Sequence, residues 1–137
     1  MEAWRLLLEV HHRLTEVMDH ELREAHELRL DWYDVLYHLN AGGGRLRMRE
    51  LAEVTLFSRT DCTRIVDRMA GAGLVRREQA MEDGRGVYAV LTAAGKQRLR
   101  EAARTHLAGI ERLFAAYVAP AEADVMASTL RRVVAET

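Results

Sequence analysis

The segment 58–70 carries two different sets of side chains on its two sides if it forms a helix. At about 100° per residue, its apolar side chains fall within about 60° of Cys62. That side holds Cys62, Ile65, Val66 and Met69. The opposite side holds Thr60, Arg64 and Asp67, and Thr63 lies on the flank. An arginine there could donate two hydrogen bonds to guanine O6 and N7, and threonine methyl groups could contact thymine methyls. The pattern fits a surface that contacts base edges, although it also fits an ordinary solvent-exposed helix face.

A second basic side chain that could bind a nucleic acid is Arg85, in the sequence Asp83-Gly84-Arg85. Asp83 could orient the Arg85 guanidinium through a charge-assisted hydrogen bond. An arginine at the tip of a thin hairpin suits the narrow minor groove of DNA, whose negative potential attracts cations. Alone, this is a common turn sequence; directly after two basic helices, it indicates a second contact with DNA.

Basic side chains are concentrated in the middle of the chain. Residues 45–100 hold 12 basic and 7 acidic side chains, whereas residues 1–44 hold 4 basic and 9 acidic ones. In a chain with a net charge of −1, such a localised basic segment indicates a surface for phosphates. The residues expected to bind phosphates are Arg45, Arg47, Arg49, Ser58 and Arg59. Contacts of this kind position a protein on DNA but do not select a sequence.

The elements around these residues predict two helices joined by a tight turn and followed by a hairpin. A helix over 49–55 is followed by one that Ser58 caps, with Asp61 three residues later, and that ends at the glycines of 71–73. Strand-like runs at 74–79 and 87–91 flank a loop that contains Asp-Gly. A helix-turn-helix followed by a β-hairpin is a winged helix. Another helix, capped by Asp31 and with Asp34 in its first turn, is predicted before it, and residues 45–47 are predicted to be extended.

Long helices are predicted at both ends of the chain. A stripe of apolar residues at helical spacing covers 2–28. Thr92 is expected to cap a fifth helix that reaches Tyr117, and Pro120 to lie in the first turn of a last helix. The predicted fold class is mainly α with a small β-hairpin wing (α+β). We expect a single domain over 1–137, with a winged-helix lobe at 31–95 and helical dimerisation regions at 1–28 and 96–137.

Five short motifs in this order and spacing resemble the MarR family of transcriptional regulators. They are RMRELA at 47–52, TRIVDRM at 63–69, GLVRR at 73–77, DGR at 83–85 and LTAAG at 91–95. The resemblance implies a winged-helix homodimer that binds a pseudo-palindromic operator, acting as a repressor more often than as an activator. It also implies that the fourth helix enters the major groove and that Arg85 enters the adjacent minor groove. The chain departs from the family at Arg49, where a serine or threonine cap usually begins the third helix.

Some relatives are expected to bind small aromatic acids between the dimer helices and the DNA-binding lobe. The residues that could line such a cleft here are His11, Trp32, Tyr33 and Tyr37, which fit ordinary core positions as well. The outer helices carry more apolar surface than one winged-helix unit can cover, which favours a homodimer. Asp67 is expected to pair with Arg77, or with an arginine of its own helix, rather than to contact DNA.

The cysteine and the histidines do not match the positions that a redox sensor or a zinc sensor of this family would use. One family branch uses a cysteine early in the first helix, where this chain has none, and Cys62 lies on the packed side of its helix. A zinc-sensing branch uses acidic and histidine ligands, for which Glu24, His38 and His106 are candidates, but position 110 is isoleucine. We therefore predict no metal site and no cofactor.

Enzyme motifs such as Gly-x-Ser-x-Gly, the Walker loop and His-Glu-x-x-His do not occur in the sequence, so no catalytic function is predicted. No apolar run approaches the ~18 residues of a membrane span, so we expect a cytoplasmic protein without a membrane partner. The favoured function is sequence-specific binding of double-stranded DNA in transcription regulation, with possible release by a small ligand. The alternative is a winged-helix module that binds proteins and not DNA.

Overall fold

The computed structural model describes residues 1–82 and 84–137. The helices and strands follow the predicted order: α1 (Glu2–His26), α2 (Leu30–Ala41), β1 (Arg45–Arg47), α3 (Met48–Thr55), α4 (Arg59–Gly71), β2 (Val75–Gln79), β3 (Val87–Leu91), α5 (Ala93–Leu113), a 3₁₀ turn (Ala115–Tyr117) and α6 (Pro120–Glu136). The fold class is confirmed: the described chain is mainly helical and has one small antiparallel sheet. In this part of the chain, no helix is both long enough and apolar enough to cross a membrane.

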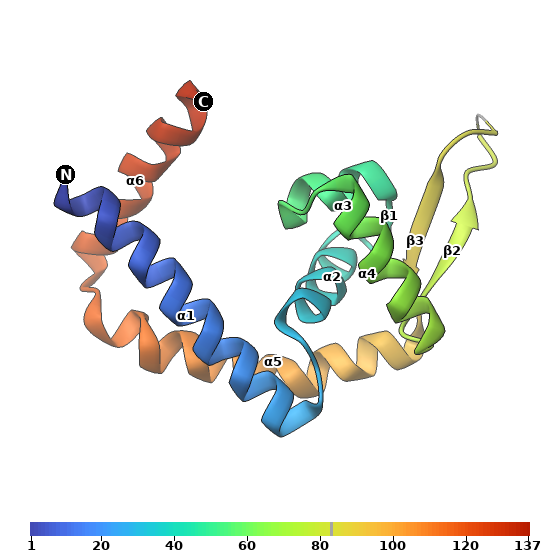
Figure 1. The fold of residues 1–137 in the computed structure, drawn as a ribbon, viewed down its shortest axis with the longest axis horizontal. Helices are drawn as coiled ribbons and strands as arrows, with labels where there is room; N and C mark the ends of the chain where they lie inside the picture. The colour runs from blue at the N-terminus through green and yellow to red at the C-terminus, as the bar shows by residue number, and fades with distance from the viewer. Residues whose placement is uncertain (83) are drawn as a thin grey trace.

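The molecule has an open shape (Figure 1). The central lobe, which comprises α2, β1, α3, α4, β2 and β3, lies on one side, and α1 and α6 lie on the other with both chain termini. Helix α5 runs along both parts and packs against α1 as well as α2. The Arg98 guanidinium reinforces the contact with α1, because it donates to the carbonyl oxygens of His26 (2.8 Å) and Glu27 (3.4 Å) at the end of that helix.

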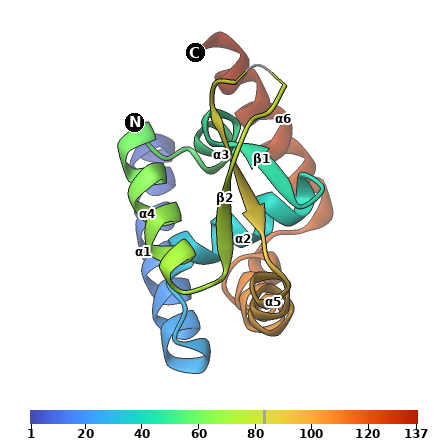
Figure 2. The same cartoon turned by 90° about the vertical axis from the view of Figure 1, so that its right-hand side faces the viewer.

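The sheet has the strand order β1-β3-β2, so β3 is the middle strand. On one side, Arg45 pairs with Val90 and Arg47 pairs with Tyr88; on the other side, Glu78 pairs with Tyr88. The β2–β3 hairpin and its loop form the wing, which projects from the lobe beyond α4 (Figure 2). In the wing loop, Gly84 (φ 63°) and Gly86 (φ 76°) have left-handed backbone conformations, which glycine adopts without steric cost.

The hydrophobic core lies between the central lobe, the C-terminal end of α1 and helix α5. Its largest fully buried side chains are Leu22, Leu28, Leu36, Leu39, Leu51 and Met69. Helix α1 contributes only Leu22, near its C-terminal end, to the buried residues, and α6 contributes none, although every residue of both helices is described. The lobe is therefore built around a core, whereas the outer helices leave most of their apolar side chains uncovered.

Two predicted helix caps are confirmed. The Ser58 hydroxyl accepts a hydrogen bond from the Asp61 backbone N–H (3.0 Å), and the Thr92 hydroxyl accepts one from the Gly95 backbone N–H (3.1 Å). These side chains satisfy N–H groups that have no partner within the first turn of a helix. The starts of α4 and α5 are thus set by local sequence.

Three predicted boundaries are wrong. Helix α2 begins at Leu30, not after Asp31, because Asp19 of α1 accepts the Leu30 backbone N–H (2.9 Å); Asp34 consequently lies beyond the first turn. Helix α3 begins at Met48, with Arg47 at the cap position, so Arg49 does not replace a cap residue. The Glu50 carboxylate instead accepts the Arg47 backbone N–H (3.0 Å). Helix α5 ends at Leu113, and a separate 3₁₀ turn follows.

Candidate nucleic-acid interface

Helix α4 presents the predicted hydroxylated and basic side to solvent. Cys62, Ile65, Val66 and Met69 are buried, as the helical pattern indicated. Residues on the opposite side line an open hollow along the helix: Arg59, Thr60, Thr63, Arg64, Asp67 and Arg68. The predicted base-contacting residues Thr60, Thr63 and Arg64 are all exposed and lie together on this side.

Arg64 has an acidic partner on its own helix. Its Nη2 atom lies 2.9 Å from Oδ1 of Asp61, and the Arg64 side chain remains 47% exposed. Hydrogen bonds from Arg64 and then from Ser58 lower the pKa of the Asp61 carboxyl. An ion pair exposed to this extent contributes little to stability. The guanidinium can therefore exchange this partner for a base edge at small cost.

Asp67 connects α4 to the wing. Its Oδ1 atom lies 3.2 Å from Nη1 of Arg77 on β2. The sequence left open whether Asp67 would pair with Arg77 or with an arginine of its own helix, and in the structure it pairs with Arg77. The ion pair holds the first strand of the hairpin next to the helix and partly offsets the repulsion that a carboxylate on this surface would exert on phosphates.

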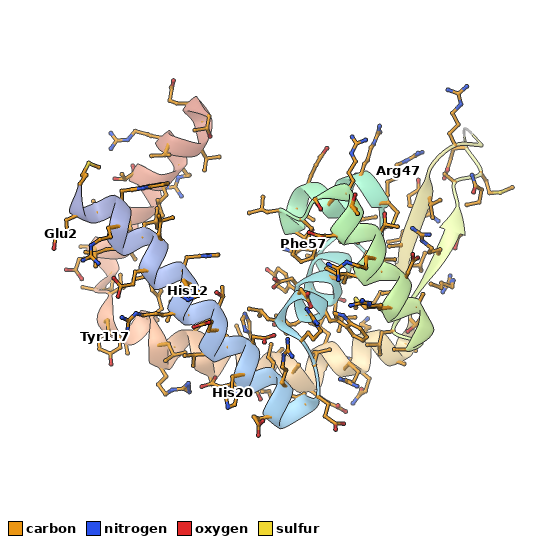
Figure 3. All side chains as sticks on the ribbon, in the orientation of Figure 1. Glu2, His12, His20, Arg47, Phe57 and Tyr117 are labelled. Carbon is orange, nitrogen blue, oxygen red and sulfur yellow. The ribbon has the colours of Figure 1, made fainter. Side chains whose placement is uncertain are left out.

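The wing lies close to the basic residues at the start of α3. Arg47, Arg49 and Arg85 line one hollow together with Met48, Gly86 and Val87. Figure 3 shows Arg47 at the same edge of the lobe as the wing. Arg85 and Arg49 are exposed, whereas the Arg47 side chain is only 22% exposed. Asp83, which was predicted to orient Arg85, falls outside the described residues.

The remaining predicted phosphate contacts lie in different settings. Ser58 and Arg59 are exposed at the N-terminal end of α4, where helix N–H groups favour an anion. Arg45 instead lies against the Tyr88 ring, with its Cζ atom 3.9 Å from the ring centroid, and it contacts two carboxylates. The structure thus places most of the predicted residues in two hollows, one along α4 and one between the start of α3 and the wing, and gives Arg45 partners of its own.

The four predicted ligand-binding residues lie in different settings, although Tyr33 and Tyr37 are neighbours. Tyr33 is buried, with its ring centroid 4.4 Å from that of His106 and 6.5 Å from that of Tyr37. Trp32 packs against the core. His11 lies elsewhere, in a hollow between α1 and the central lobe whose described lining includes none of the three aromatic residues.

That hollow contains charged residues that sequence reasoning did not single out. Its lining includes His11, Asp19, Arg23, Arg29, Asp34 and Phe57. Figure 3 shows Phe57 on the side of the lobe that faces α1. Burial, together with the nearby Asp31 carboxylate, raises the pKa of the Asp34 carboxyl to about 6. Asp31 itself forms an ion pair with Arg29 at 3.1 Å. The sequence could not indicate this site, because its members come from α1, α2 and the turn between α3 and α4.

Cys62 is buried, and His38 and His106 are partly buried. Desolvation raises the pKa of the Cys62 thiol. Burial lowers the pKa of both His38 and His106. Across residues 1–82 and 84–137, no group of three histidine, cysteine or acidic side chains is arranged to hold a metal ion.

Together, the exposed helix α4, the three-stranded sheet and the projecting hairpin define a winged helix-turn-helix protein. The sequence model of the MarR family matches residues 26–86. AbsC, a MarR family transcriptional regulator from Streptomyces coelicolor, is 34% identical, with a TM-score of 0.92 over 98% of this chain and 90% of AbsC. The chain therefore belongs to the MarR family and is a DNA-binding transcriptional regulator.

Two further solved structures are also similar. Sco3205, a MarR family regulator from Streptomyces coelicolor solved in complex with DNA, is 28% identical, with a TM-score of 0.90 over 96% of this chain and 83% of that one. PcaV, a regulator from the same organism solved with its natural ligand, is 27% identical, with a TM-score of 0.75 over 96% of this chain and 89% of that one. Among curated protein sequences, none matches the chain.

Proposed function

We propose that the protein is a cytoplasmic homodimeric repressor that binds a pseudo-palindromic operator. The observation that carries this proposal is the exposed side of α4, where Thr60, Thr63 and Arg64 lie together on a helix that contacts the first strand of the wing. A DNA complex of the similar protein Sco3205 supports the same use of the fold. We assign residues 31–95 to DNA binding and residues 1–28 and 96–137 to dimerisation.

Each class of contact has a distinct role in this proposal. Thr60, Thr63 and Arg64 contact base edges in the major groove, where each base pair presents a different pattern of donors and acceptors. Arg85 enters the adjacent minor groove. The residues that bind phosphates are Arg47, Arg49, Ser58 and Arg59. The first group sets the sequence preference, and the last group sets overall affinity and its dependence on salt.

Uncovered apolar surface on the outer helices supports the homodimer. Trp4 is 60% exposed on α1, and Tyr117 is 81% and Val134 73% exposed near the C-terminus. A hollow between α1, the end of α5 and α6 has an almost entirely apolar lining that includes Leu6, Val10, Phe114, Met126 and Leu130. A contiguous apolar surface of this kind is costly in water and marks an interface. A second copy would cover it and would place two α4 helices on successive turns of DNA.

The proposal includes release from DNA by a small ligand. The hollow between α1 and the central lobe is a candidate site, because a molecule bound there would change how the lobe sits on the dimer helices. The structure of the similar protein PcaV in complex with its natural ligand supports a ligand-binding role for this fold. Arg29 could pair with a carboxylate of an aromatic acid in that hollow, in exchange for Asp31.

The test begins with selection of bound sequences from a random duplex library, followed by affinity measurements on the recovered site and on random DNA. Arg64→Ala should weaken binding to the recovered site by roughly tenfold and relax its sequence preference. Arg49→Ala should weaken binding to both DNAs alike. Arg104→Ala, at an exposed position on α5, is the matched control: sedimentation equilibrium should show the same assembly as the wild type, and neither affinity should change.

Three outcomes would contradict the proposal. If the protein binds no duplex at low salt, it is not a DNA-binding regulator but a winged-helix module of another kind. If Arg64→Ala and Arg49→Ala have the same effect on both DNAs, the assigned roles are wrong. If sedimentation equilibrium shows a stable folded monomer at micromolar concentration, the dimer is wrong.

A further inference from the structure

Arg45 belongs to a cluster at the base of the wing that does not resemble a phosphate site. We call Arg45, Glu78, Glu82 and Tyr88 the wing-base cluster. The Arg45 guanidinium lies 3.3 Å from Glu78 through Nη1 and 3.3 Å from Glu82 through Nη2. Its Cζ atom lies 3.9 Å from the centroid of the Tyr88 ring, within the range of a cation–π interaction.

Strand register independently places the cluster on one face of the sheet. Tyr88 of β3 is directly opposite Arg47 of β1 and Glu78 of β2. Arg45 is two residues before Arg47 and therefore points to the same face, because side chains alternate along a strand. Arg45 thus comes from β1, Tyr88 from the middle strand and Glu78 from β2, so the guanidinium reaches across all three strands.

Glu82 extends the cluster into the wing loop. The Tyr88 hydroxyl donates to Oε1 of Glu82 (3.4 Å), the same atom that contacts Arg45. Oε2 of Glu82 lies 3.9 Å from Nη2 of Arg47. Glu82 is three residues before Arg85, so the loop that carries Arg85 is attached at this point to β1 and β3.

Charge argues against a phosphate role for Arg45. Glu78 and Glu82 place two carboxylates on its guanidinium, and one face of the guanidinium is covered by the ring. A phosphate could approach only by displacing those carboxylates or by lying beside them, where they would repel it. Arg49, by contrast, is exposed at the start of α3.

We propose that Arg45 is a positioning residue, which holds the wing on β1 and so determines where Arg85 meets DNA. This inference rests on the proposed function, because Arg85 is taken to contact the minor groove. It assigns Arg45 a contribution to affinity that acts through the wing and not through a phosphate. Arginine suits this role because its planar group can stack on a ring and bind two carboxylates at once, which lysine cannot reproduce.

The test is a double-mutant cycle on the selected operator that combines Arg45→Gln with Arg85→Gln. We expect each single variant to weaken binding by roughly tenfold and the double variant to be no weaker than Arg85→Gln alone. Arg45→Lys should weaken binding as much as Arg45→Gln. Arg49 provides the matched control: Arg49→Gln should be additive with Arg85→Gln, and Arg49→Lys should remain near the wild type.

Salt dependence gives a second readout. Log affinity falls linearly with log salt concentration, and loss of one phosphate contact makes this fall less steep, lowering the magnitude of the slope by about 0.9. We therefore expect the Arg45→Gln/Arg85→Gln variant to have the same slope as Arg85→Gln, whereas Arg49→Gln/Arg85→Gln should have a lower slope. An additive effect of Arg45→Gln with a further fall in slope would overturn the proposal and make Arg45 a phosphate contact.

Hydrogen exchange without DNA separates this proposal from the proposed function. Arg45→Gln should speed amide exchange in β2 and β3 by several-fold through local opening, and Arg49→Gln should not. If wild-type protein fails to bind DNA but this difference in exchange is observed, the proposed function is wrong and the wing attachment stands. Unchanged exchange in Arg45→Gln would overturn the attachment itself.

Discussion

Asp34→Asn should stabilise the protein at neutral pH and have only a small effect near pH 4. Asp34 is partly buried in the hollow between α1 and the central lobe, and desolvation followed by the Asp31 charge raises its pKa from 3.8 to about 6. At about 1.4 kcal/mol per pKa unit, this rise corresponds to about 3 kcal/mol. Asparagine has nearly the same shape as the protonated acid and carries no charge.

The direction in which pH changes the free energy of unfolding depends on whether the folded or the unfolded chain binds the Asp34 proton more tightly. Below about pH 3, Asp34 is protonated in the folded and unfolded chains, so its ionisation costs nothing. Between about pH 3 and pH 6, the unfolded chain releases the proton first, and the free energy of unfolding falls. Above about pH 6 the penalty is complete. The gain from Asp34→Asn should therefore grow from about 0.5 kcal/mol at pH 4 to about 2–3 kcal/mol at pH 7.5.

Urea unfolding followed by circular dichroism at pH 4, 5, 6 and 7.5 measures this difference. Protein concentration is held constant, because association would stabilise the folded state by mass action. Glu53→Gln, at an exposed position on α3, removes one negative charge from the surface and is the control; its effect should be small at every pH. A gain from Asp34→Asn that is equal at pH 4 and pH 7.5, or a loss at pH 7.5, would refute the reasoning.

Two substitutions at special backbone positions have opposite expected effects on the free energy of unfolding, measured by urea titration. Gly95→Ala should destabilise the folded protein by about 3 kcal/mol, because a Cβ there would lie 2.1 Å from the Leu74 carbonyl oxygen, well inside van der Waals contact. An unchanged unfolding midpoint would show that α5 can move away from Leu74 at no cost. Leu56→Gly should stabilise by about 1 kcal/mol, because Leu56 has a φ of 64° and is 90% exposed, so glycine relieves strain without loss of packing. A lower stability in that variant would mean that the Leu56 side chain is covered in the assembled protein.

Local periodicity was sufficient to predict most of the fold. The side of α4 that contains Cys62 and Met69 is apolar at helical spacing, so its burial could be predicted, and the exposure of Arg64 on the other side follows from the same geometry. The caps at Ser58 and Thr92 also depend only on residues within one turn. Features determined by short-range contacts are therefore accessible from the sequence.

Predictions that depended on distant partners were less successful. Asp31 was expected to cap α2, but Asp19, eleven residues before Leu30, supplies the acceptor for the Leu30 N–H group. The contacts of Arg45 arise from strand register and from a carboxylate 37 residues away, neither of which is evident in a local pattern. The hollow that contains Asp34 is likewise formed by segments that only the tertiary fold brings together.

The middle position of β3 has a mechanical consequence. This strand is hydrogen-bonded on one edge to β1, directly before α3, and on the other edge to β2, directly after α4. The sheet consequently links the hairpin to both α3 and α4. If α4 and the hairpin enter neighbouring grooves as we propose, a tilt that lifts α4 out of the major groove should also withdraw the hairpin, so that both contacts are lost in one step.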